Sequence, residues 1–509
     1  MIEPRHVVVI GGGAAGLVAA LDCARVGIRV TVVERAQAPG GSVATETVAG
    51  IRVDTGAESY ATRGGTVRAL VDSLGLADAV VTPAVAGAWV RLPDGRSVPL
   101  PKAGLLGIPS NPLADDVRRV IGWRGAVRAY LDRIRPVLTI GREHNLGELV
   151  ERRMGKAVLE SLVAPVTRGV YSADPYDLDV ARAAPGLNRA LTVAGSLSGA
   201  VAMLRADAPA GSAVEGLRGG MSTLVDALVA EIRSREGELL LGVGATGLAR
   251  VSATGPVQDA AAGASWQVAL DDERVLDADY VIIATPEADA LRLLAPFSTG
   301  ISAAEPTETP TVELVTLVID TAALDAAPRG TGVLVAESER STVLAKALTH
   351  STAKWEWLRT EASAEHPHRH VVRLSYGRQG ASNPTIELPD ADVRGIALRD
   401  AAEILGVPLD DSQVAGFTRT MWGGTLPGAA LRQRERAEAL RAAALAVGDV
   451  DVTGAWLSGT GLASVVPDAL AASARIRHLV ASSYLEFGAF DDGHTRTGMG
   501  KTSPDETDA

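Results

Sequence analysis

Residues 6–34 read HVVVIGGGAAGLVAALDCARVGIRVTVVE, and this stretch decides the fold. The β-branched run 6–10 predicts a buried strand, residues 14–26 a helix that ends at Gly27, and residues 28–33 a second strand. Strand, glycine turn, helix and strand within about 30 residues form the βαβ unit of a doubly wound sheet. The sequence therefore predicts an α/β fold that begins with a Rossmann-like unit.

The turn after the first strand has the spacing G-x-G-x-x-G, at Gly11, Gly13 and Gly16. The first glycine permits a tight turn, the second lets a pyrophosphate approach the backbone, and the third lets the helix pack closely on the strand. Glu34 ends the second strand, where a carboxylate can accept hydrogen bonds from ribose hydroxyls. The segment is typical of sites for the ADP half of NAD or FAD, and a glycine turn without a ligand is the less favoured alternative.

Length and charge exclude several other classes of protein. The 509 residues allow about two to four domains. The formal net charge of −12 argues against general binding to nucleic acid or to anionic lipid. The single cysteine, Cys23, is expected to face the core and fits a reducing compartment, so we expect a cytoplasmic protein. Glu3 and the glycines of the first apolar run argue against a signal peptide, and no uncharged apolar stretch of 18 residues predicts a transmembrane segment.

The rest of the chain alternates between strand and helix patterns. The turn Pro93-Asp94-Gly95 predicts a hairpin between residues 89–92 and 97–100, and residues 111–203 have mostly helical periodicity, which indicates an insertion. Further strands are expected at residues 266–270, 274–276, 280–284, 314–319, 332–335, 343–347 and 371–375, and further helices at residues 393–405 and 431–447.

Several motifs after the first βαβ unit resemble segments of known flavoproteins. Gly40-Gly41 and Asp54-Thr55-Gly56-Ala57-Glu58-Ser59 resemble segments of the flavoprotein group that contains amine oxidases, phytoene desaturases and protoporphyrinogen oxidases. The stretches 169–175 (GVYSADP), 215–221 (EGLRGGM) and 459–462 (GTGL) are similar to signatures of the oxygen-dependent protoporphyrinogen and coproporphyrinogen III oxidases. The acidic, Arg-rich chain resembles the actinobacterial branch of that family, over nearly its whole length except the end.

The resemblance implies an α/β fold with a discontinuous Rossmann-like FAD-binding domain, a mixed-sheet substrate domain and a helical insertion. The FAD-binding domain is expected at residues 1–75, 206–300 and 421–485, and the helical insertion at residues 111–205. The substrate domain is expected as a hairpin at residues 76–110 and a sheet at residues 301–420. Residues 486–509 are polar, Gly-rich and acidic, and are expected to form a disordered tail.

FAD is the cofactor that the resemblance implies, and it assigns the binding residues by motif. Those expected to contact FAD are Gly11, Gly12, Gly13, Ala14, Ala15, Gly16, Glu34, Arg35, Gly40, Gly41, Ser42, Gly56, Ala57, Glu58, Ser59, Ala245, Trp422, Gly459, Thr460, Gly461 and Leu462. The chain departs from the family at Ala463-Ser464 and at Gly428-Ala429, which weakens any side-chain role there.

The reaction that the resemblance implies is the six-electron oxidation of coproporphyrinogen III by O2, with H2O2 as product, in haem biosynthesis. Protoporphyrinogen IX is the alternative substrate. Another amine oxidase or desaturase activity and an inactive flavin-binding protein are further alternatives. The expected partners are the porphyrinogen and O2, with transient contacts to other haem-biosynthesis enzymes.

Arginine is the side chain expected to bind the carboxylates of the substrate, because its planar guanidinium can bind a carboxylate through two hydrogen bonds. The candidates are Arg63, Arg91, Arg168 and Arg378. No catalytic side chain is assigned, because the flavin carries the chemistry. His366, His368 and His370 are expected to form a solvated turn and no metal site, and Trp355 and Trp357 to serve in packing.

Overall fold

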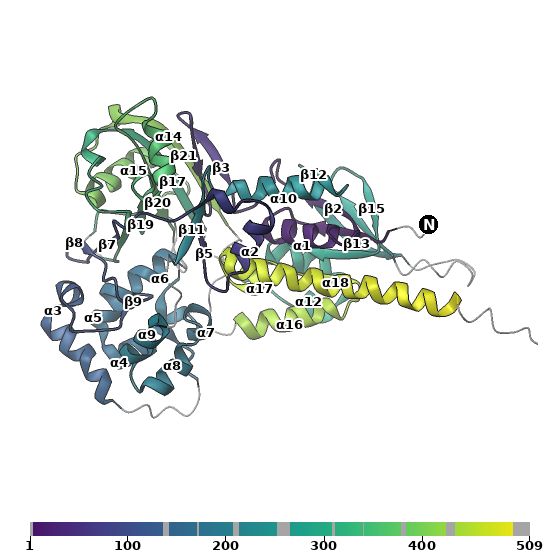
Figure 1. Cartoon of the computed structure of the whole chain (residues 1–509), viewed down its shortest axis with the longest axis horizontal. Coiled ribbons are helices and arrows are strands. Elements are labelled where there is room, and N and C mark those ends of the chain that lie inside the picture. The colour runs from purple at the N-terminus through teal and green to yellow at the C-terminus, as the bar shows by residue number, and fades with distance from the viewer. Residues whose placement is uncertain are drawn as a thin grey trace, which may run out of the picture.

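The structure is a computed structural model that describes residues 4–135, 142–170, 173–206, 213–251, 265–307, 311–338, 341–377, 383–423 and 433–491. The chain forms two lobes that lie side by side (Figure 1). One lobe holds the first strands and the last long helix. The other holds a large sheet, with a group of helices below it in the view of Figure 1.

The first lobe is built on a five-stranded parallel sheet in the order β12-β2-β1-β16-β22. Every residue of β1 is buried, because helices or a second sheet cover both faces, and such strands are continuously apolar. The strands are β1 (His6–Ile10), β2 (Arg29–Glu34), β12 (Glu238–Leu241), β16 (Tyr280–Ile283) and β22 (Val450–Val452).

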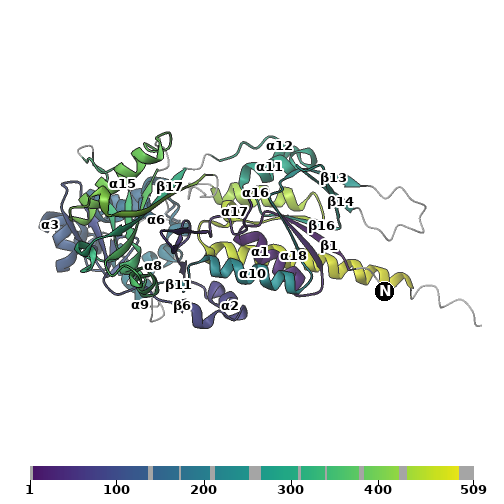
Figure 2. The same cartoon turned by 90° about the horizontal axis from the view of Figure 1, so that it is seen from above.

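Alternate residues of β1 point into different cores. Val7 and Val9 belong to a cluster with α1, α10 and α18, whereas Val8 and Ile10 belong to a cluster with β13, β14, α11 and α16. Figure 2 shows α10 and α11 on opposite sides of β1. The covering elements are α1 (Ala14–Ala24), α10 (Ser222–Ser234), α18 (Leu462–Asp491), β13 (Ala245–Val251), β14 (Ser265–Leu270), β15 (Val275–Ala278), α11 (Glu287–Leu294), α12 (Thr299–Ser302) and α16 (Gln433–Leu445).

The second lobe contains a seven-stranded mixed sheet in the order β21-β17-β20-β19-β18-β7-β8. Its pairs are antiparallel except for β18 with β7. The strands are β7 (Ala88–Arg91), β8 (Ser97–Pro99), β17 (Val312–Asp320), β18 (Gly332–Val335), β19 (Ala347–His350), β20 (Arg369–Tyr376) and β21 (Val414–Trp422). One face packs on α15 (Asp390–Leu405); the other packs on α13 (Ser351–Lys354), α14 (Glu356–Ser363) and the hairpin β3 (Thr45–Val48) and β4 (Ile51–Asp54).

The helical unit has its own core of leucine, valine and alanine side chains. Its helices are α3 (Asp115–Tyr130), α4 (Leu146–Met154), α5 (Lys156–Val158), α6 (Ala164–Val170), α7 (Val180–Ala183), α8 (Leu187–Ala194) and α9 (Leu197–Ala206). Short elements connect the units: β5 (Tyr60–Ala61), α2 (Thr66–Ser73), β6 (Val80–Val81), β9 (Gly104–Leu105), β10 (Ile108–Pro109), β11 (Val214–Leu217) and α17 (Ala455–Ser458).

The predicted fold class is confirmed, and so are the first βαβ unit, the hairpin β7–β8 and the helices between β10 and β11. Two predicted elements are wrong. The strand expected at residues 343–347 lies at β19 instead, because the backbone N–H groups of Leu344 and Ala345 bind the Asp400 carboxylate rather than a strand. Residues 486–491, expected to begin the tail, are instead helical, because α18 continues to Asp491; the rest of the expected tail, residues 492–509, lies outside the described ranges.

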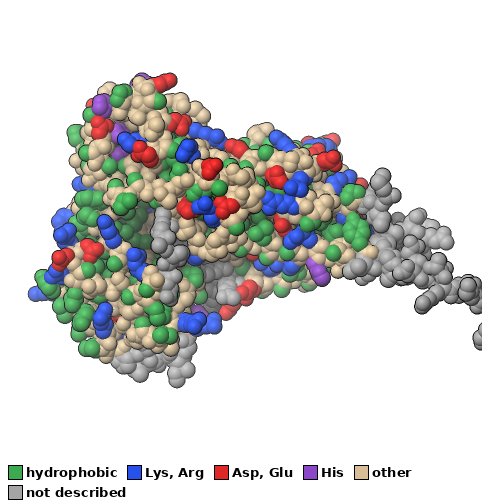
Figure 3. All heavy atoms as spheres, in the orientation of Figure 1, with side chains coloured by type: hydrophobic (Ala, Val, Ile, Leu, Met, Phe, Trp, Pro, Cys, Tyr) green, Lys and Arg blue, Asp and Glu red, His purple; other side chains and the backbone are tan. Residues whose placement is uncertain are grey.

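Within the described ranges, no single helix is long and apolar enough to cross a membrane, although the pair α8 and α9, bent by 115°, passes that test by length and composition together. On the face shown in Figure 3, acidic and basic side chains are interspersed over the first lobe. Arginines and lysines stand among hydrophobic side chains over the helical unit.

Candidate functional site: a dinucleotide cavity shared by two lobes

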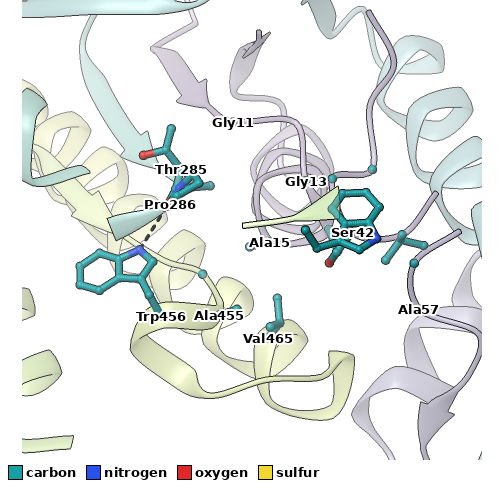
Figure 4. A pocket seen from close by; sticks show the side chains of 18 of the residues that line it. Gly11, Gly13, Ala15, Ser42, Ala57, Thr285, Pro286, Ala455, Trp456 and Val465 are labelled. Atoms are coloured by element: carbon teal, nitrogen blue, oxygen red, sulfur yellow. Dashed lines mark hydrogen bonds between the residues drawn. The ribbon is translucent and has the colours of Figure 1, made fainter. Parts of the chain in front are cut away.

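A cavity of about 980 Å³ runs from the carboxyl ends of β1 and β2 to the large sheet of the second lobe. This volume lies at the upper end of the range of ligand sites in proteins. In Figure 4, Gly13, Ser42 and Ala57 form one side of it, and Thr285 and Trp456 form the other. The walls come from segments far apart in the sequence, namely residues 10–15, 33–36, 40–43, 56–63, 243–245, 284–293 and 454–465.

The three glycines of the first turn have a geometry that fits the roles predicted from their spacing. Gly11 has a φ of 107°, and its N–H donates to the carbonyl of Val33 at 2.8 Å. A Cβ on Gly16 would lie 1.8 Å from the Gly11 oxygen, so this glycine allows close packing. A Cβ on Gly13 would meet nothing within 4 Å, so open space lies beside the first turn of α1, where backbone N–H groups lack helical partners. This geometry fits a diphosphate.

Glu34 lies at the rim of the cavity, and the backbone fixes its carboxylate. Oε2 accepts the N–H of Gly12 at 2.7 Å, and Oε1 accepts the N–H of Ala36 at 2.8 Å. A carboxylate can accept about four hydrogen bonds, so both oxygens retain capacity for ribose hydroxyls. The Glu34 end of the cavity therefore fits the ADP half of FAD.

The second glycine turn lies directly against the first. Gly40 donates its N–H to the carbonyl of Gly12 at 2.8 Å, and Ala57 donates to the carbonyl of Ser42 at 2.8 Å. A Cβ on Gly56 would lie 2.0 Å from the Ser42 oxygen, so only glycine permits this contact. These hydrogen bonds connect the segments of the cavity wall that run from α1 toward the second lobe.

The last part of the chain forms another wall. Gly461, with a φ of 91°, precedes α18, and a Cβ on it would meet nothing within 4 Å. Trp456 donates its indole N–H to the carbonyl of Thr285 at 3.1 Å, the bond drawn in Figure 4. Asp468 of α18 accepts the hydroxyl of Thr453 at 2.8 Å and the N–H of Gly454 at 3.4 Å, and so anchors this wall.

The residues beside Ala245 include an arginine that sequence reasoning missed. Arg292 lines the cavity and donates to the carbonyls of Thr246 at 2.6 Å and Ala245 at 3.1 Å. Asp289 pairs with both Arg292 and Arg35. No glycine motif marks Arg292; only its place on the helix after β16 could have suggested it.

Most of the residues expected to contact FAD line this cavity. They are Gly11, Gly13, Ala14, Ala15, Glu34, Arg35, Gly40, Gly41, Ser42, Gly56, Ala57, Ser59, Ala245, Trp422, Thr460, Gly461 and Leu462. Gly12, Gly16, Glu58 and Gly459 are not among the lining residues. Gly12 supports Glu34 and Gly16 packs on Gly11, whereas the Glu58 side chain is buried behind the wall.

The four arginines proposed as ligands of substrate carboxylates differ in their position relative to the cavity. Arg63 lines the cavity, and its guanidinium donates to the hydroxyl of Ser464 at 3.2 Å. Arg91 is not brought to the cavity, because it pairs with Glu403 at 2.5 Å, and Arg168 is held by Asp174 at 2.5 Å and Glu337 at 2.8 Å. Arg378 lies outside the described residues.

Arg373, which sequence reasoning missed, reaches the cavity from β20 together with Ser375. The alternation of side chains along β20 could have indicated this position. Val372 and Leu374 point into the core with α15, so Arg373 and Ser375 face the other way. Val312 and Leu314 line the same end from β17, and Trp422 ends β21 there, its indole N–H bonded to the carbonyl of Thr55 at 2.7 Å.

The histidine-rich stretch is not a solvated turn throughout. His370 is buried in β20 and, with His368, contacts the Asp325 carboxylate. His350 lies beside His370, and burial together with this neighbour lowers the pKa of His350 to about 3. Among the described residues, no group of three or more His, Cys, Asp or Glu side chains could hold a metal ion. Cys23 is buried in the core, and Trp355 and Trp357 pack as expected.

Comparison with known proteins agrees with this geometry. The family model described as flavin containing amine oxidoreductase matches residues 14–476. A coproporphyrinogen III oxidase of Bacillus subtilis (strain 168) is 26% identical, over 92% of this chain and 97% of the relative. The coproporphyrinogen III oxidase of Mycobacterium leprae (strain TN) is 30% identical, over 81% of this chain and 85% of the relative. The crystal structure of a putative protoporphyrinogen oxidase from Exiguobacterium sp. 255-15 has a similar fold, with a TM-score of 0.78 at 22% identity, over 96% of this chain and all of that one.

The fold and the cavity thus define an FAD-dependent oxidoreductase, with a Rossmann-like lobe for the cofactor and a mixed sheet at the far end of its site. The chain belongs to the family of flavin containing amine oxidoreductases, in the group that includes the coproporphyrinogen III oxidases.

Proposed function

We propose that this enzyme oxidises coproporphyrinogen III to coproporphyrin III in haem biosynthesis, with O2 as the electron acceptor. The observation that carries the proposal is that one continuous cavity is lined by Glu34 at its dinucleotide end, by Leu314 and Ser375 of the large sheet, and by the cation of Arg63. The relatives named coproporphyrinogen III oxidase, which match most of the chain, support the choice of substrate.

The overall reaction consumes one coproporphyrinogen and three O2, and yields one coproporphyrin and three H2O2. When bound, FAD supplies the two-electron chemistry, accepting hydride from the substrate and passing electrons to O2. The chain's own residues bind and orient the substrate. Val312 and Leu314 offer apolar surface to a macrocycle, and Arg63 offers a hydrogen-bonding fork to a carboxylate. We assign no protein side chain to proton transfer.

The test is steady-state O2 consumption by the purified yellow protein with each porphyrinogen, alongside the fluorescence of the porphyrin formed. We expect coproporphyrinogen III to have the higher kcat/KM and three H2O2 to form per porphyrin. Preference for protoporphyrinogen IX would replace the substrate in the proposal. Turnover of an amine alone, or FAD binding without any turnover, would overturn it in favour of another oxidase or of an inactive flavin-binding protein.

A pair of arginine variants tests the orientation of the substrate. We expect R63A to lower kcat/KM for coproporphyrinogen III by about 1.5–3 kcal/mol, the scale of one charge-assisted hydrogen bond, with an unchanged flavin spectrum. R91A is the control, because Arg91 is held by Glu403 away from the cavity. Equal effects of the two variants would show that Arg63 does not contact a carboxylate.

We further propose that the enzyme acts in the cytoplasm and makes transient contacts with other haem-biosynthesis enzymes. A chain with one cysteine, Cys23, fits a reducing compartment. Fractionation of the native cells, followed by detection of the flavoprotein in each fraction, measures the first part. Cross-linking in those cells measures the second.

A further inference from the structure

A buried ion cluster lies directly behind the wall of the cavity formed by residues 54–59. Glu58 accepts the indole N–H of Trp355 at 2.7 Å through Oε1. Through Oε2 it faces the guanidinium of Arg373 at 3.0 Å and the ammonium of Lys354 at 3.3 Å. The Glu58, Arg373 and Lys354 side chains are 7%, 13% and 19% exposed. Charges desolvated to this extent act on one another and on their surroundings more strongly than charges in water.

Arg373 connects this cluster to the backbone of the cavity wall. While its Nη2 binds Glu58, its Nη1 donates to the carbonyls of Asp54 at 3.0 Å and Gly56 at 2.9 Å. Gly56 and Ala57 line the cavity, and Arg373 itself is a lining residue, whereas Glu58 and Lys354 are not. One guanidinium therefore clamps the wall and presents a positive charge to the cavity, and Glu58 orients it.

The charges in the cluster do not cancel. Burial raises the pKa of Glu58, but Lys354 and Arg373, with hydrogen bonds from Trp355 and Ser351, outweigh burial and lower it to about 2, so Glu58 is ionised. The nearby Asp54 carboxyl is only partly ionised at neutral pH, because burial raises its pKa to about 7. Arg52 is paired with Asp226. Two cations therefore face one full and one partial negative charge.

The end of the cavity beside this cluster is the end away from Glu34. Since Glu34 fits the ribose of the ADP half, the flavin half of FAD extends toward Gly56, Ala57 and Trp422. Reduction adds two electrons and, with one proton, leaves one more negative charge on the ring system. A cation at this wall favours that state, since charge near the ring tunes a flavin.

We propose that the cluster of Arg373, Glu58 and Lys354 sets the reduction potential of the bound flavin, with Arg373 as the cation that faces the cavity and Glu58 as the positioning residue that orients and partly neutralises it. This inference rests on the FAD dependence of the proposed function but not on its substrate. Loss of positive charge from the cluster lowers the potential, and loss of negative charge raises it.

The experiment measures the potential of the holoenzyme at pH 7 by equilibrium reduction against a reference dye, without any porphyrinogen. R373M is expected to lower the equilibrium constant for two-electron reduction at least tenfold, which is about 30 mV. E58Q is expected to raise it at least threefold, about 14 mV, and K354M to lower it by a similar factor. R373K keeps the charge and should stay within threefold of the parent.

The double variant E58Q/R373M provides the strictest comparison, because it removes one charge of each sign and its equilibrium constant should lie closer to that of the parent than that of R373M does. The matched control is E313Q. Glu313 is also buried and paired with an arginine, Arg419, but it points away from the cavity between the lining residues Val312 and Leu314. No shift is expected there.

A disturbance of packing alone would move R373M and E58Q in the same direction. Shifts of the same sign, or shifts no larger than that of E313Q, would overturn the inference. If R373M does not retain FAD, the opposite shifts expected of E58Q and K354M decide the question. Because no porphyrinogen is used, a failure here is distinct from a failure of the proposed substrate.

Discussion

Glu34 is a residue where one carboxylate joins the glycine turn to the end of β2 through two backbone hydrogen bonds. We expect E34A to weaken FAD binding by about 1.5–3 kcal/mol, because it removes charge-assisted bonds to the backbone and to the ribose. Titration of the deflavinated protein with FAD, followed by flavin fluorescence, gives the dissociation constant. The control is E238A at the exposed start of β12, the neighbouring strand. Equal dissociation constants for the parent and E34A would contradict the assignment.

Asp54 should make stability depend on pH. Burial raises its pKa to about 7, so the folded protein holds a proton that the unfolded chain releases near pH 4. This contribution to stability is present at low pH and is lost as pH rises toward 7. D54N keeps an acceptor for the N–H of Met221 but does not titrate.

Urea unfolding of D54N and of the parent at pH 5 and pH 8 measures this effect. The parent should lose stability between pH 5 and pH 8, whereas D54N should not. The free energy of unfolding of D54N minus that of the parent should therefore be about 2 kcal/mol larger at pH 8 than at pH 5. D226N, a change at an exposed carboxylate, is the control and should show no such gain. A constant difference between D54N and the parent across this pH range would show that Asp54 is ionised throughout.

Residue patterns predicted the backbone of the site better than its side chains. The glycines at 11, 13 and 16 could be assigned because each role depends on local spacing and φ. Spacing does not show which arginines line the cavity, because an arginine that forms an ion pair elsewhere can lie equally close to a motif in the sequence. Arg91 forms an ion pair elsewhere, whereas Arg373 reaches the wall only through pairing of β20 in the folded sheet.

At the scale of elements, Asp132 fixes the packing of the helical unit. It is fully buried, forms an ion pair with Arg153, and accepts the N–H groups of Leu197 at 2.6 Å and Ser198 at 3.1 Å at the start of α9. We expect D132N to reduce the free energy of unfolding by about 3–5 kcal/mol, because it leaves the Arg153 charge buried and uncompensated.

Urea unfolding followed by circular dichroism measures the loss in D132N. The control is D115N, which removes an exposed partner of Arg118 at the start of α3 and should cost less than about 1 kcal/mol. If the two variants are equally stable, the buried pair does not hold the helical unit together.

Elements with a strong period were predicted well, and those decided by a distant contact were not. The buried run of β1 and the hairpin at Pro93-Asp94-Gly95 carry local signals. The start of β19 depends on Asp400, a residue of α15, and the extent of α18 depends on contacts such as that of Tyr484 with Arg5 near the other end of the chain. Neither partner is visible in a local window of sequence.

For the whole molecule, the net charge of −12 repels an anionic substrate, so attraction must come from arginines gathered at the cavity. Coproporphyrinogen III carries four propionates and protoporphyrinogen IX two. We expect the KM for coproporphyrinogen III to rise more steeply with ionic strength, because salt screens charges beyond about 10 Å at 0.1 M. Assays of both substrates over a salt series, with FAD content measured in parallel, test this. Parallel KM curves would indicate selection by shape.

The two-lobe arrangement was predicted in outline from the resemblance and from the switch between helical and extended patterns. The division into domains at particular residues stays a proposal. β21 runs through the boundary expected at residue 420, and the hairpin β3–β4, assigned to the first lobe, packs on the second. Residues that join two lobes belong to both cores, and composition alone does not mark them.

The order of strands in the parallel sheet has a consequence for synthesis of the protein. β1 is made first, yet its sheet is completed by β22, and Arg5 contacts Tyr484, 479 positions later. A chain growing on the ribosome must therefore keep the apolar face of its first helix covered by other means until nearly all of it has been translated. We therefore expect cofactor capture to be completed late in biogenesis, because residues 454–465, which form one wall of the cavity, are made near the end of translation.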